Sequence, residues 1–170
     1  MAMPIGIEML AQRKATISRF SESRAWRSSS PELISSQAAL KIAVGGGRPR
    51  GFEKGFYIEP TIFTDVHPYM RIAQEEIFGP VLTIIGYDTV DQAVAIANDT
   101  PYGLAAYISG GDLEAARKVA SRLRAGQVTL NSAPSDMMAP FGGYKQSGNG
   151  REWGEHAFAE FLEIKAVVGY

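Results

Sequence analysis

The chain has 170 residues, of which 45% are hydrophobic, a proportion typical of a globular chain with a substantial buried core. Its 17 basic and 18 acidic residues leave a formal net charge of −1, so no basic excess indicates a nucleic-acid partner. The chain has no cysteine, which excludes disulfides and cysteine nucleophiles within these residues, and no apolar run of about 18 residues that could span a membrane.

Residues 1–37 differ in composition from the rest of the chain. The first 40 residues hold eight serines, and their five basic residues outnumber three acidic ones. Pro4 and Glu8 interrupt any apolar core of a secretory signal, whereas an Arg- and Ser-rich segment is also typical of organellar transit peptides. We therefore expect a solvated, poorly ordered segment on a cytoplasmic protein, with organellar targeting as the alternative.

Three apolar segments lie between residues 39 and 86. Residues 39–44 form a short run that ends at three glycines. Residues 55–64 are rich in aromatic and β-branched side chains, but Pro60 would interrupt a central ladder, so we predict two short extended pieces or an edge strand. Residues 80–86 are almost continuously apolar, which predicts a strand covered on both faces, as in a parallel sheet.

Two helices alternate with two further strands between residues 89 and 130. Thr89 and Gln92 have the spacing of a capping box and begin the first helix, and Asp112 caps the second. Their apolar stripes are Val90, Ala93, Val94, Ala97 and Leu113, Ala116, Ala120, Leu123. Residues 104–108 and 127–130 are the expected strands. The order strand, helix, strand, helix, strand predicts two βαβ crossovers and a parallel α/β layer.

The C-terminal segment alternates like a strand from residue 161 to residue 168. One face would carry Leu162, Ile164, Ala166 and Val168. No later segment could pair with this strand, and an unpaired strand must be covered or donated to another sheet.

Two aperiodic segments concentrate residues that are typical of ligand sites. Residues 74–81 place two adjacent carboxylates and a phenylalanine on a turn before the apolar strand, although adjacent acids are more often a solvated loop. Residues 140–152 combine four glycines with aromatic and charged side chains, and such loops often line ligand sites. His67 and His156 lie far apart without ligand spacing, so no metal site is predicted.

Together these segments resemble the aldehyde dehydrogenase superfamily from about Ala38 to Tyr170. The resemblance also includes residues 56–61 (FYIEPT), residues 98–104 (NDTPYGL) and Asn131. It implies an α/β fold: a parallel-sheet layer of an aldehyde dehydrogenase catalytic domain over residues 38–156, followed by a C-terminal oligomerisation strand over residues 157–170. Residues 1–37 are unmatched, and disorder or a frameshift would explain them.

The resemblance assigns residues to two sides of a cofactor and substrate pocket. Glu76 corresponds to the carboxylate that accepts hydrogen bonds from the ribose diol on the nicotinamide side of NAD or NADP. Phe78 corresponds to an aromatic side chain near the nicotinamide ring. Phe141 corresponds to a wall of the substrate pocket, and Met137 and Met138 lie in the segment that varies with the aldehyde accepted. Loop or core packing remains the alternative for either methionine.

In this family a cysteine thiolate attacks the aldehyde, hydride passes to NAD or NADP, and a glutamate-activated water hydrolyses the thioester to a carboxylic acid. The resemblance implies that the cysteine, the general base and the oxyanion-stabilising asparagine all precede the matched part. The chain itself has no cysteine. We therefore expect no catalytic residue here, weak or absent NAD binding, and no aldehyde oxidation by the chain alone.

Three interpretations stay open. The chain is part of an aldehyde dehydrogenase that acts on a small-molecule aldehyde only within a longer polypeptide, or a non-catalytic module whose C-terminal strand joins an intact homologous subunit, or an inert gene remnant. A homo-oligomer or association with a homologue is expected, with neither nucleic acid nor membrane as a partner. The sheet is expected to expose an apolar patch, because the domain that normally covers it is missing.

Overall fold

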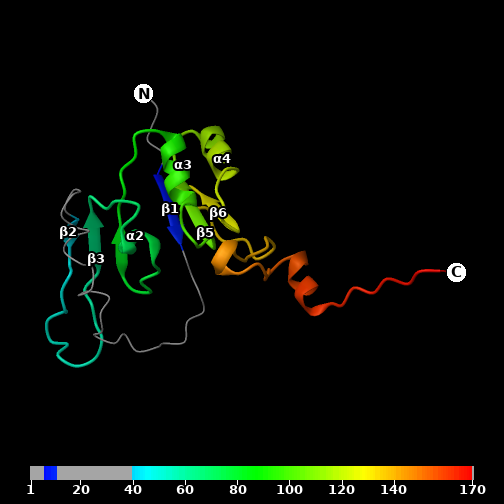
Figure 1. Cartoon of the computed structure of the whole chain (residues 1–170), viewed down its shortest axis with the longest axis horizontal. Helices are drawn as coiled ribbons and strands as arrows, with labels where there is room; N and C mark the ends of the chain where they lie inside the picture. The colour runs from blue at the N-terminus through cyan, green and yellow to red at the C-terminus, as the bar shows by residue number, and fades with distance from the viewer. Residues whose placement is uncertain (1–5, 11–39, 170) are drawn as a thin grey trace. The chain divides into compact units, whose positions relative to one another are not determined.

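The computed structural model describes residues 6–10 and 40–169 (Figure 1). Contacts divide the chain into unit 1, which comprises residues 1–12 and 88–170, and unit 2, which comprises residues 13–87. Unit 1 contains β1 (Gly6–Leu10), α3 (Val90–Asn98), β5 (Ala105–Ser109), α4 (Leu113–Ala120), β6 (Gln127–Leu130) and the 3-10 helices η1 (Lys145–Ser147) and η2 (Glu155–Phe161). Unit 2 contains β2 (Lys41–Val44), β3 (Thr61–Thr64), α2 (Arg71–Gln74) and β4 (Val81–Thr83).

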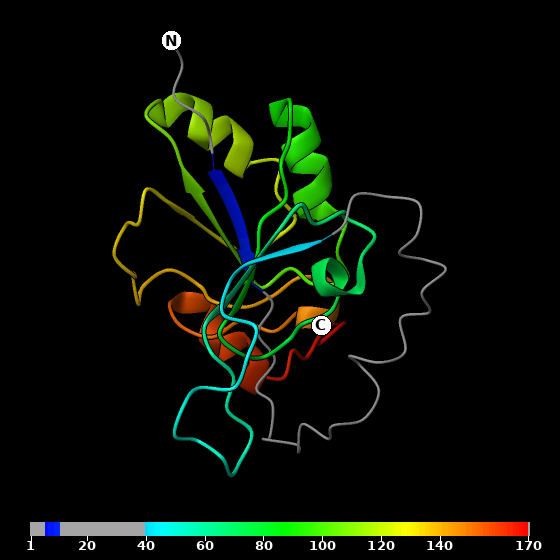
Figure 2. The same ribbon diagram turned by 90° about the vertical axis from the view of Figure 1, so that its left-hand side faces the viewer.

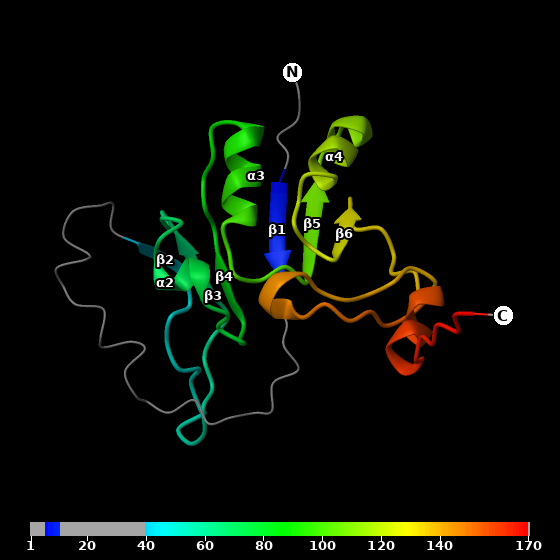
Figure 3. The ribbon, with the colours of Figure 1, turned by 45° about the vertical axis from the view of Figure 1, so that its right-hand side comes forward.

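Unit 1 is built on a three-stranded sheet in the order β1-β5-β6, drawn with its strands side by side in Figure 3. β5 runs parallel to β6 and antiparallel to β1, with Ile7 directly opposite Ile108. Ala106 and Ile108 are fully buried in a core that α3 and α4 share with the sheet. The buried members of this core are Val94, Ala97, Ala106, Ile108, Ala116, Val119, Leu123 and Ala125. Because one continuous core includes both helices and alternate residues of β5, the helices pack on one face of the sheet.

Both helices of unit 1 begin where the sequence predicts. The Thr89 hydroxyl accepts a hydrogen bond from the Gln92 amide at 3.2 Å, and the Asp112 carboxylate accepts from the amides of Glu114 and Ala115 at 2.9 and 3.0 Å. These bonds satisfy amides that have no partner inside the helix. The reciprocal bond of the first cap differs from the usual capping box, because the Gln92 side chain accepts from the amide of Asp88.

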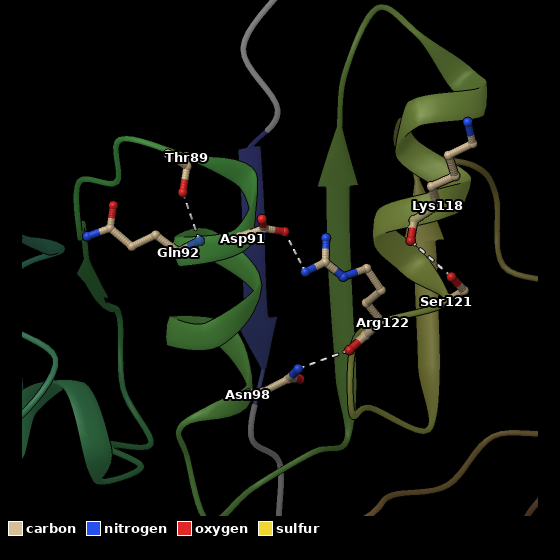
Figure 4. A network of polar contacts seen from close by, with 7 residues as sticks. All are labelled: Thr89, Asp91, Gln92, Asn98, Lys118, Ser121 and Arg122. Atoms are coloured by element: carbon tan, nitrogen blue, oxygen red, sulfur yellow. Dashed lines mark hydrogen bonds and ion pairs between the residues drawn. The ribbon is translucent and has the colours of Figure 1, made fainter.

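Polar side chains fasten the segment after α4 to α3 (Figure 4). The Asn98 side chain donates to the Arg122 carbonyl at 2.9 Å and accepts from the Arg124 amide at 2.7 Å. At the other end of α3, the Arg122 guanidinium lies 2.7 Å from the Asp91 carboxylate. Asn98 therefore fixes the C-terminal end of α3 beside the turn that leads into β6.

Unit 2 contains a three-stranded sheet in the order β2-β3-β4, with β3 antiparallel to β2 and parallel to β4. The loop between β2 and β3, residues 45–60, extends away from this sheet (Figure 2). Gly45 begins the loop at a φ of 69°, and a β-carbon there would lie 2.2 Å from the Pro60 carbonyl oxygen. Only glycine fits that position without a shift of the backbone.

The structure contradicts two expectations for the strands of unit 2: that residues 55–64 form an edge strand, and that the run at residues 80–86 is covered on both faces. β3 is the central strand of its sheet, because Pro60 lies just before the strand and removes no ladder hydrogen bond. The apolar run at residues 80–86 yields only the short strand β4, and it is not covered on both faces: Leu82 is 44% exposed and Ile84 48%. A continuous apolar run indicates that burial of the strand is favoured, but burial also requires other segments that pack on both faces of the sheet.

The two expected crossovers also have different outcomes. The second forms as predicted, because β5 and β6 are parallel and joined by α4. The first does not place its strands in one sheet: β4 pairs with β3, whereas β5 pairs with β1 and β6. Local patterns identify strands, but the pairing of their edges depends on which other strands are available.

The two ends of the chain depart from their expected local structure. Residues 6–10, part of a segment expected to be poorly ordered, form β1, while the remainder of residues 1–37 lies outside the described residues. Phe161 ends the 3-10 helix η2 instead of beginning a strand. Residues 162–169 then continue without a ladder partner in the described part of the chain, and the Ile164 side chain is 100% exposed. The donated strand therefore stays a prediction that needs a partner.

Candidate functional site

The turn that carries the predicted cofactor residues lies between α2 and β4. α2 is a single turn that ends at Gln74; the amide of the next residue, Glu75, donates to the Arg71 carbonyl at 2.8 Å. The Arg71 guanidinium also donates to both Glu75 carboxylate oxygens, at 2.6 and 2.8 Å. The hydrogen bonding from Arg71 is the main reason that the pKa of Glu75 lies below its usual value; burial opposes this shift, and the Arg71 charge adds to it. The neighbouring Glu76 is half-buried. The two adjacent acids are thus not equivalent.

Phe78 adopts a backbone conformation that is unfavourable for an aromatic residue. Its φ is 56°, in the left-handed region, and such strain costs about 1–3 kcal/mol. The side chain is 60% exposed, so packing within the chain offsets little of that cost. A tight bond from the Val81 amide to the Gly79 carbonyl, 2.7 Å long, closes the turn immediately afterwards. The strained turn therefore presents an aromatic face at the surface of unit 2.

Phe141 is held rigidly in unit 1. Its amide donates to the Glu152 carbonyl at 2.7 Å, and the Glu152 amide donates back to the Phe141 carbonyl at 2.6 Å. The Phe141 ring stacks on Trp153 with 5.0 Å between ring centroids. Backbone and ring contacts together fix the position of this half-buried side chain.

The two predicted methionines differ from Phe141 in their surroundings. Met137 and Met138 are both exposed, whereas their backbones are tied: the Met138 amide donates to the Asp136 carboxylate at 2.9 Å, and the Gly154 amide donates to the Met137 carbonyl at 3.3 Å. Core packing is thereby excluded for both side chains in this structure. An exposed pair of flexible apolar side chains remains available to a ligand or to another part of a protein.

The glycine-rich loop after Phe141 is clamped onto residues 98–104, a contact that no local sequence pattern predicts. The Tyr144 amide donates to the Gly103 carbonyl at 2.9 Å, and the Gly103 amide donates to the Ser147 hydroxyl at 3.1 Å. The Lys145 ammonium donates to the carbonyls of Asn98 and Thr100 at 2.7 and 2.9 Å. Two motifs of the resemblance, far apart in the sequence, thus hold each other in place.

The environment of Lys145 agrees with this structural role. Burial lowers the pKa of Lys145, the nearby Arg124 lowers it further, and Asp99 opposes both effects. Lys145 itself has a φ of 56°, in the left-handed region. Its two carbonyl acceptors belong to the end of α3 and the turn that follows, where the helix leaves carbonyl groups without partners. The side chain therefore satisfies the helix end and locks the loop.

Close backbone approach explains Gly142 in the same loop and Gly126, which lies against it. A β-carbon on Gly126 would lie 1.6 Å from the Gly142 carbonyl oxygen, and one on Gly142 would lie 2.0 Å from the Gly150 carbonyl oxygen. The guanidinium groups of Arg124 and Arg151 both lie over the Tyr144 ring, each 5.4 Å from the ring centroid. Gly126 and Gly142 therefore allow two backbone segments to pack closely together.

Asn131 also has a structural use. Its side chain accepts from the Gly110 amide at 2.9 Å and donates to the Gly110 carbonyl at 3.0 Å, which ties the end of β6 to the turn after β5. Asn131 has a φ of 49°, in the left-handed region, which asparagine tolerates better than most residues.

The predicted site residues fall into both units. Glu76 and Phe78 lie in unit 2, whereas Phe141, Met137 and Met138 lie in unit 1. Within unit 1 the loop brings Phe141 and the methionines into one continuous segment, and within unit 2 one turn carries Glu76 and Phe78. The described part of the chain contains no group of three or more His, Cys, Asp or Glu residues placed to hold a metal ion. Its helices are also too short or too polar for any of them to cross a membrane.

The model of the aldehyde dehydrogenase family matches residues 27–167 of this sequence. The chain belongs to the aldehyde dehydrogenase family. The match begins upstream of Ala38, where the resemblance in the sequence becomes visible, and β1 precedes it.

Individual aldehyde dehydrogenases are similar to this chain in sequence and in structure. A 3-succinoylsemialdehyde-pyridine dehydrogenase of a Pseudomonas species is 59% identical over 134 residues, which cover 79% of this chain and 28% of the relative. The crystal structure of a mutant aldehyde dehydrogenase C from Pseudomonas syringae, in complex with NAD+ and octanal, is 64% identical with a TM-score of 0.72 and covers 76% of this chain and 27% of that one. The NAD+ complex of a Mycobacterium tuberculosis aldehyde dehydrogenase is 46% identical with a TM-score of 0.69, covering 76% and 28%.

These similarities confirm the expected fold, an α/β arrangement with parallel strands that matches aldehyde dehydrogenase structures. They also show that the chain corresponds to only part of a complete family member, because it spans 26–28% of the length of the relatives it matches. Structures of relatives in complex with NAD+ support NAD dependence for the family.

Proposed function

We propose that this chain supplies a nicotinamide-side turn and a substrate-side loop of an NAD(P)-dependent aldehyde dehydrogenase catalytic domain, and that it oxidises no aldehyde by itself. The observation that carries the proposal is the turn at Glu76 and Phe78. A strained, exposed aromatic follows a half-buried carboxylate within a segment that matches the family. Backbone strain of this kind clusters at functional sites.

The chemistry of this turn fits the cofactor that the family implies. An ionised Glu76 offers two acceptor oxygens to the two neighbouring hydroxyls of a ribose. The exposed Phe78 ring offers a flat apolar wall to a planar heteroaromatic ring. When bound, NAD or NADP supplies the hydride acceptor. Glu75 cannot replace Glu76 without giving up the two hydrogen bonds from Arg71.

On the substrate side, Phe141 is the rigid element of the proposed pocket and the methionines are its adaptable part. The stack on Trp153 and the bridge to Glu152 hold the Phe141 ring in one orientation. Met137 and Met138 expose unbranched apolar side chains that can adjust to the shape of an apolar aldehyde.

The covalent chemistry must come from other polypeptide. The sequence contains no cysteine, so no thiolate is available to attack an aldehyde within these 170 residues. The surfaces described above can bind and orient, but they cannot form a thioester.

A direct assay tests this proposal. The purified chain is mixed with NAD+ or NADP+ and octanal, and we expect no NADH or NADPH formation. Co-expression with the N-terminal part of the unmutated Pseudomonas syringae aldehyde dehydrogenase C is expected to restore oxidation. In that reconstituted enzyme, Glu76→Gln raises the KM for NAD+ at least about tenfold, since a hydrogen bond to a charged group contributes about 1.5–3 kcal/mol and about 1.4 kcal/mol is a factor of ten. Glu75→Gln is the matched control and leaves the KM unchanged. Turnover by the pure chain would contradict the proposal.

A second candidate function is a non-catalytic module that donates its C-terminal strand to an intact homologous subunit. The exposed apolar tail favours it, because Ile164 and Val168 are 100% and 92% exposed. Co-elution of the chain with an intact homologue, abolished by Val168→Asp, would support this function. An inert gene remnant would show neither co-elution nor reconstitution.

A further inference from the structure

β1 pairs with the core of unit 1 although it lies outside the family match. Residues Gly6–Leu10 pair with β5 along five residues, from Gly6 opposite Ser109 to Leu10 opposite Ala105 (Figure 3). The family match begins only at residue 27. The sheet of unit 1 is thus completed by a segment that does not belong to the recognisable aldehyde dehydrogenase sequence.

The backbone geometry of β5 shows what this strand covers. The Ile108 carbonyl accepts from the Asn131 amide, so the polar backbone groups of Ile108 point toward β6. Since alternate residues of a strand point to opposite edges, the backbone groups of Ala105, Tyr107 and Ser109 point toward β1. Without β1 these three residues would present an open, unpaired edge.

That edge lies directly beside the buried core. Ala105, Ala106 and Ile108 are buried in unit 1, and the Ile7 side chain of β1 packs against the same core. An open strand edge next to apolar side chains is a template for pairing with another chain. β1 therefore contributes both a row of backbone partners and an apolar contact.

We propose that Gly6–Leu10 is an intramolecular edge strand that closes the β5 edge in cis and so keeps this edge from accepting a strand of another chain. The inference concerns the assembly of unit 1 and does not rest on the proposed enzymatic role. A strand of the same chain competes at an effective concentration that does not fall on dilution. A free strand at micromolar concentration then has little access to the same edge.

The absence of cysteine from the sequence allows a clean test in the full chain. Glu8 lies directly opposite Tyr107, where Cα atoms of paired strands are about 4.5–5.5 Å apart, within the range of about 4.4–6.8 Å that a disulfide accepts. The double variant Glu8→Cys/Tyr107→Cys is expected to form an intrachain disulfide on mild oxidation. The control Glu8→Cys/Ser109→Cys joins diagonal positions about 7–8 Å apart and is expected to remain mostly reduced.

Non-reducing gels and mass spectrometry distinguish the outcomes. An intrachain disulfide in the first variant but not in the control supports closure in cis. Disulfide-linked dimers would show that the strand is exchanged between chains, and a free thiol in both variants would show that the strands do not pair in this register. Either result would overturn the proposal.

A second measurement tests the closure of the edge. A fluorescent peptide of residues 4–11 is added to the full chain and to its Ile7→Asp variant. We expect binding, measured by fluorescence anisotropy, only to the variant, because loss of the apolar contact releases the edge. Ile7→Val keeps the contact and is expected to bind no peptide. Equal binding to all three chains would show that the edge is open in the parent, and binding to none would show that this edge accepts no strand. Each of these results would also overturn the proposal.

Discussion

Neighbouring residues of one type differ here because their contacts differ. Glu75 and Glu76 are adjacent in sequence, yet Glu75 accepts both hydrogen bonds that Arg71 directs at it, and only Glu76 is half-buried. Lys145 and Ser147 belong to the most recognisable motif, and their polar groups hold α3 and Gly103 in place. Membership in a family motif therefore does not separate residues that bind ligands from residues that hold the loop in place.

The Arg71–Glu75 pair gives a pH-dependent prediction. Because Arg71 lowers the pKa of Glu75 in the folded chain, the pair contributes stability above the ordinary carboxyl pKa of 4.5, and the contribution is lost as the pH falls through the lowered value. Arg71→Met is expected to return the pKa of Glu75 toward 4.5, as followed by NMR titration of its side-chain carboxyl. Arg50→Met removes a charge elsewhere in unit 2 and should leave the titration unchanged. An unchanged pKa in Arg71→Met would contradict this assignment.

At the scale of elements, local signals predicted the helices well. Thr89 and Asp112 cap α3 and α4 as expected, and Ala116 lies in the buried core. The first residue of each predicted apolar stripe is not buried: Val90 and Leu113 are exposed at the N-terminal ends of α3 and α4. Capping and helical periodicity depend on residues within a few positions of one another, so the sequence contains them completely.

The cap of α4 should be measurable as stability. Asp112→Ala removes the acceptor of two amide hydrogen bonds and is expected to lower the free energy of unfolding by about 0.5–2 kcal/mol. Asp112→Ser keeps an oxygen acceptor and is expected to retain most of the stability. Urea denaturation of both variants, followed by circular dichroism, checks the difference. Equal midpoints for the parent and Asp112→Ala would argue against the cap.

At the scale of the whole molecule, the part of the chain that the structure describes exposes many large apolar side chains. Val44, Leu82 and Ile84 are exposed around the sheet of unit 2, which agrees with the expected apolar patch. The chain covers 26–28% of its relatives, so much of what packs around a complete catalytic domain lies outside these residues.

We therefore expect the chain to self-associate. Leu82→Lys/Ile84→Lys places two charges on the exposed face of β4 and the residue that follows it, and the average mass measured by light scattering should fall toward that of a monomer. Leu113→Lys, at an exposed apolar position of α4, serves as the control and should change the mass little. If the double variant associated as strongly as the parent, this face would not be the one that drives association.

The sequence by itself determined the family, the capped helices, and the strands β5 and β6 of the second crossover, because each depends on short-range patterns or on motifs whose residues are contiguous. Tertiary structure decided which strand edges pair. β3 is central although Pro60 precedes it, β4 and β5 lie in different sheets, and β1 completes the sheet beside β5. It also decided that the glycine-rich loop is clamped onto residues 98–104. Strand pairing and the contact of the loop depend on which distant segments supply hydrogen-bond partners to each backbone group, and no local pattern of residues contains that information.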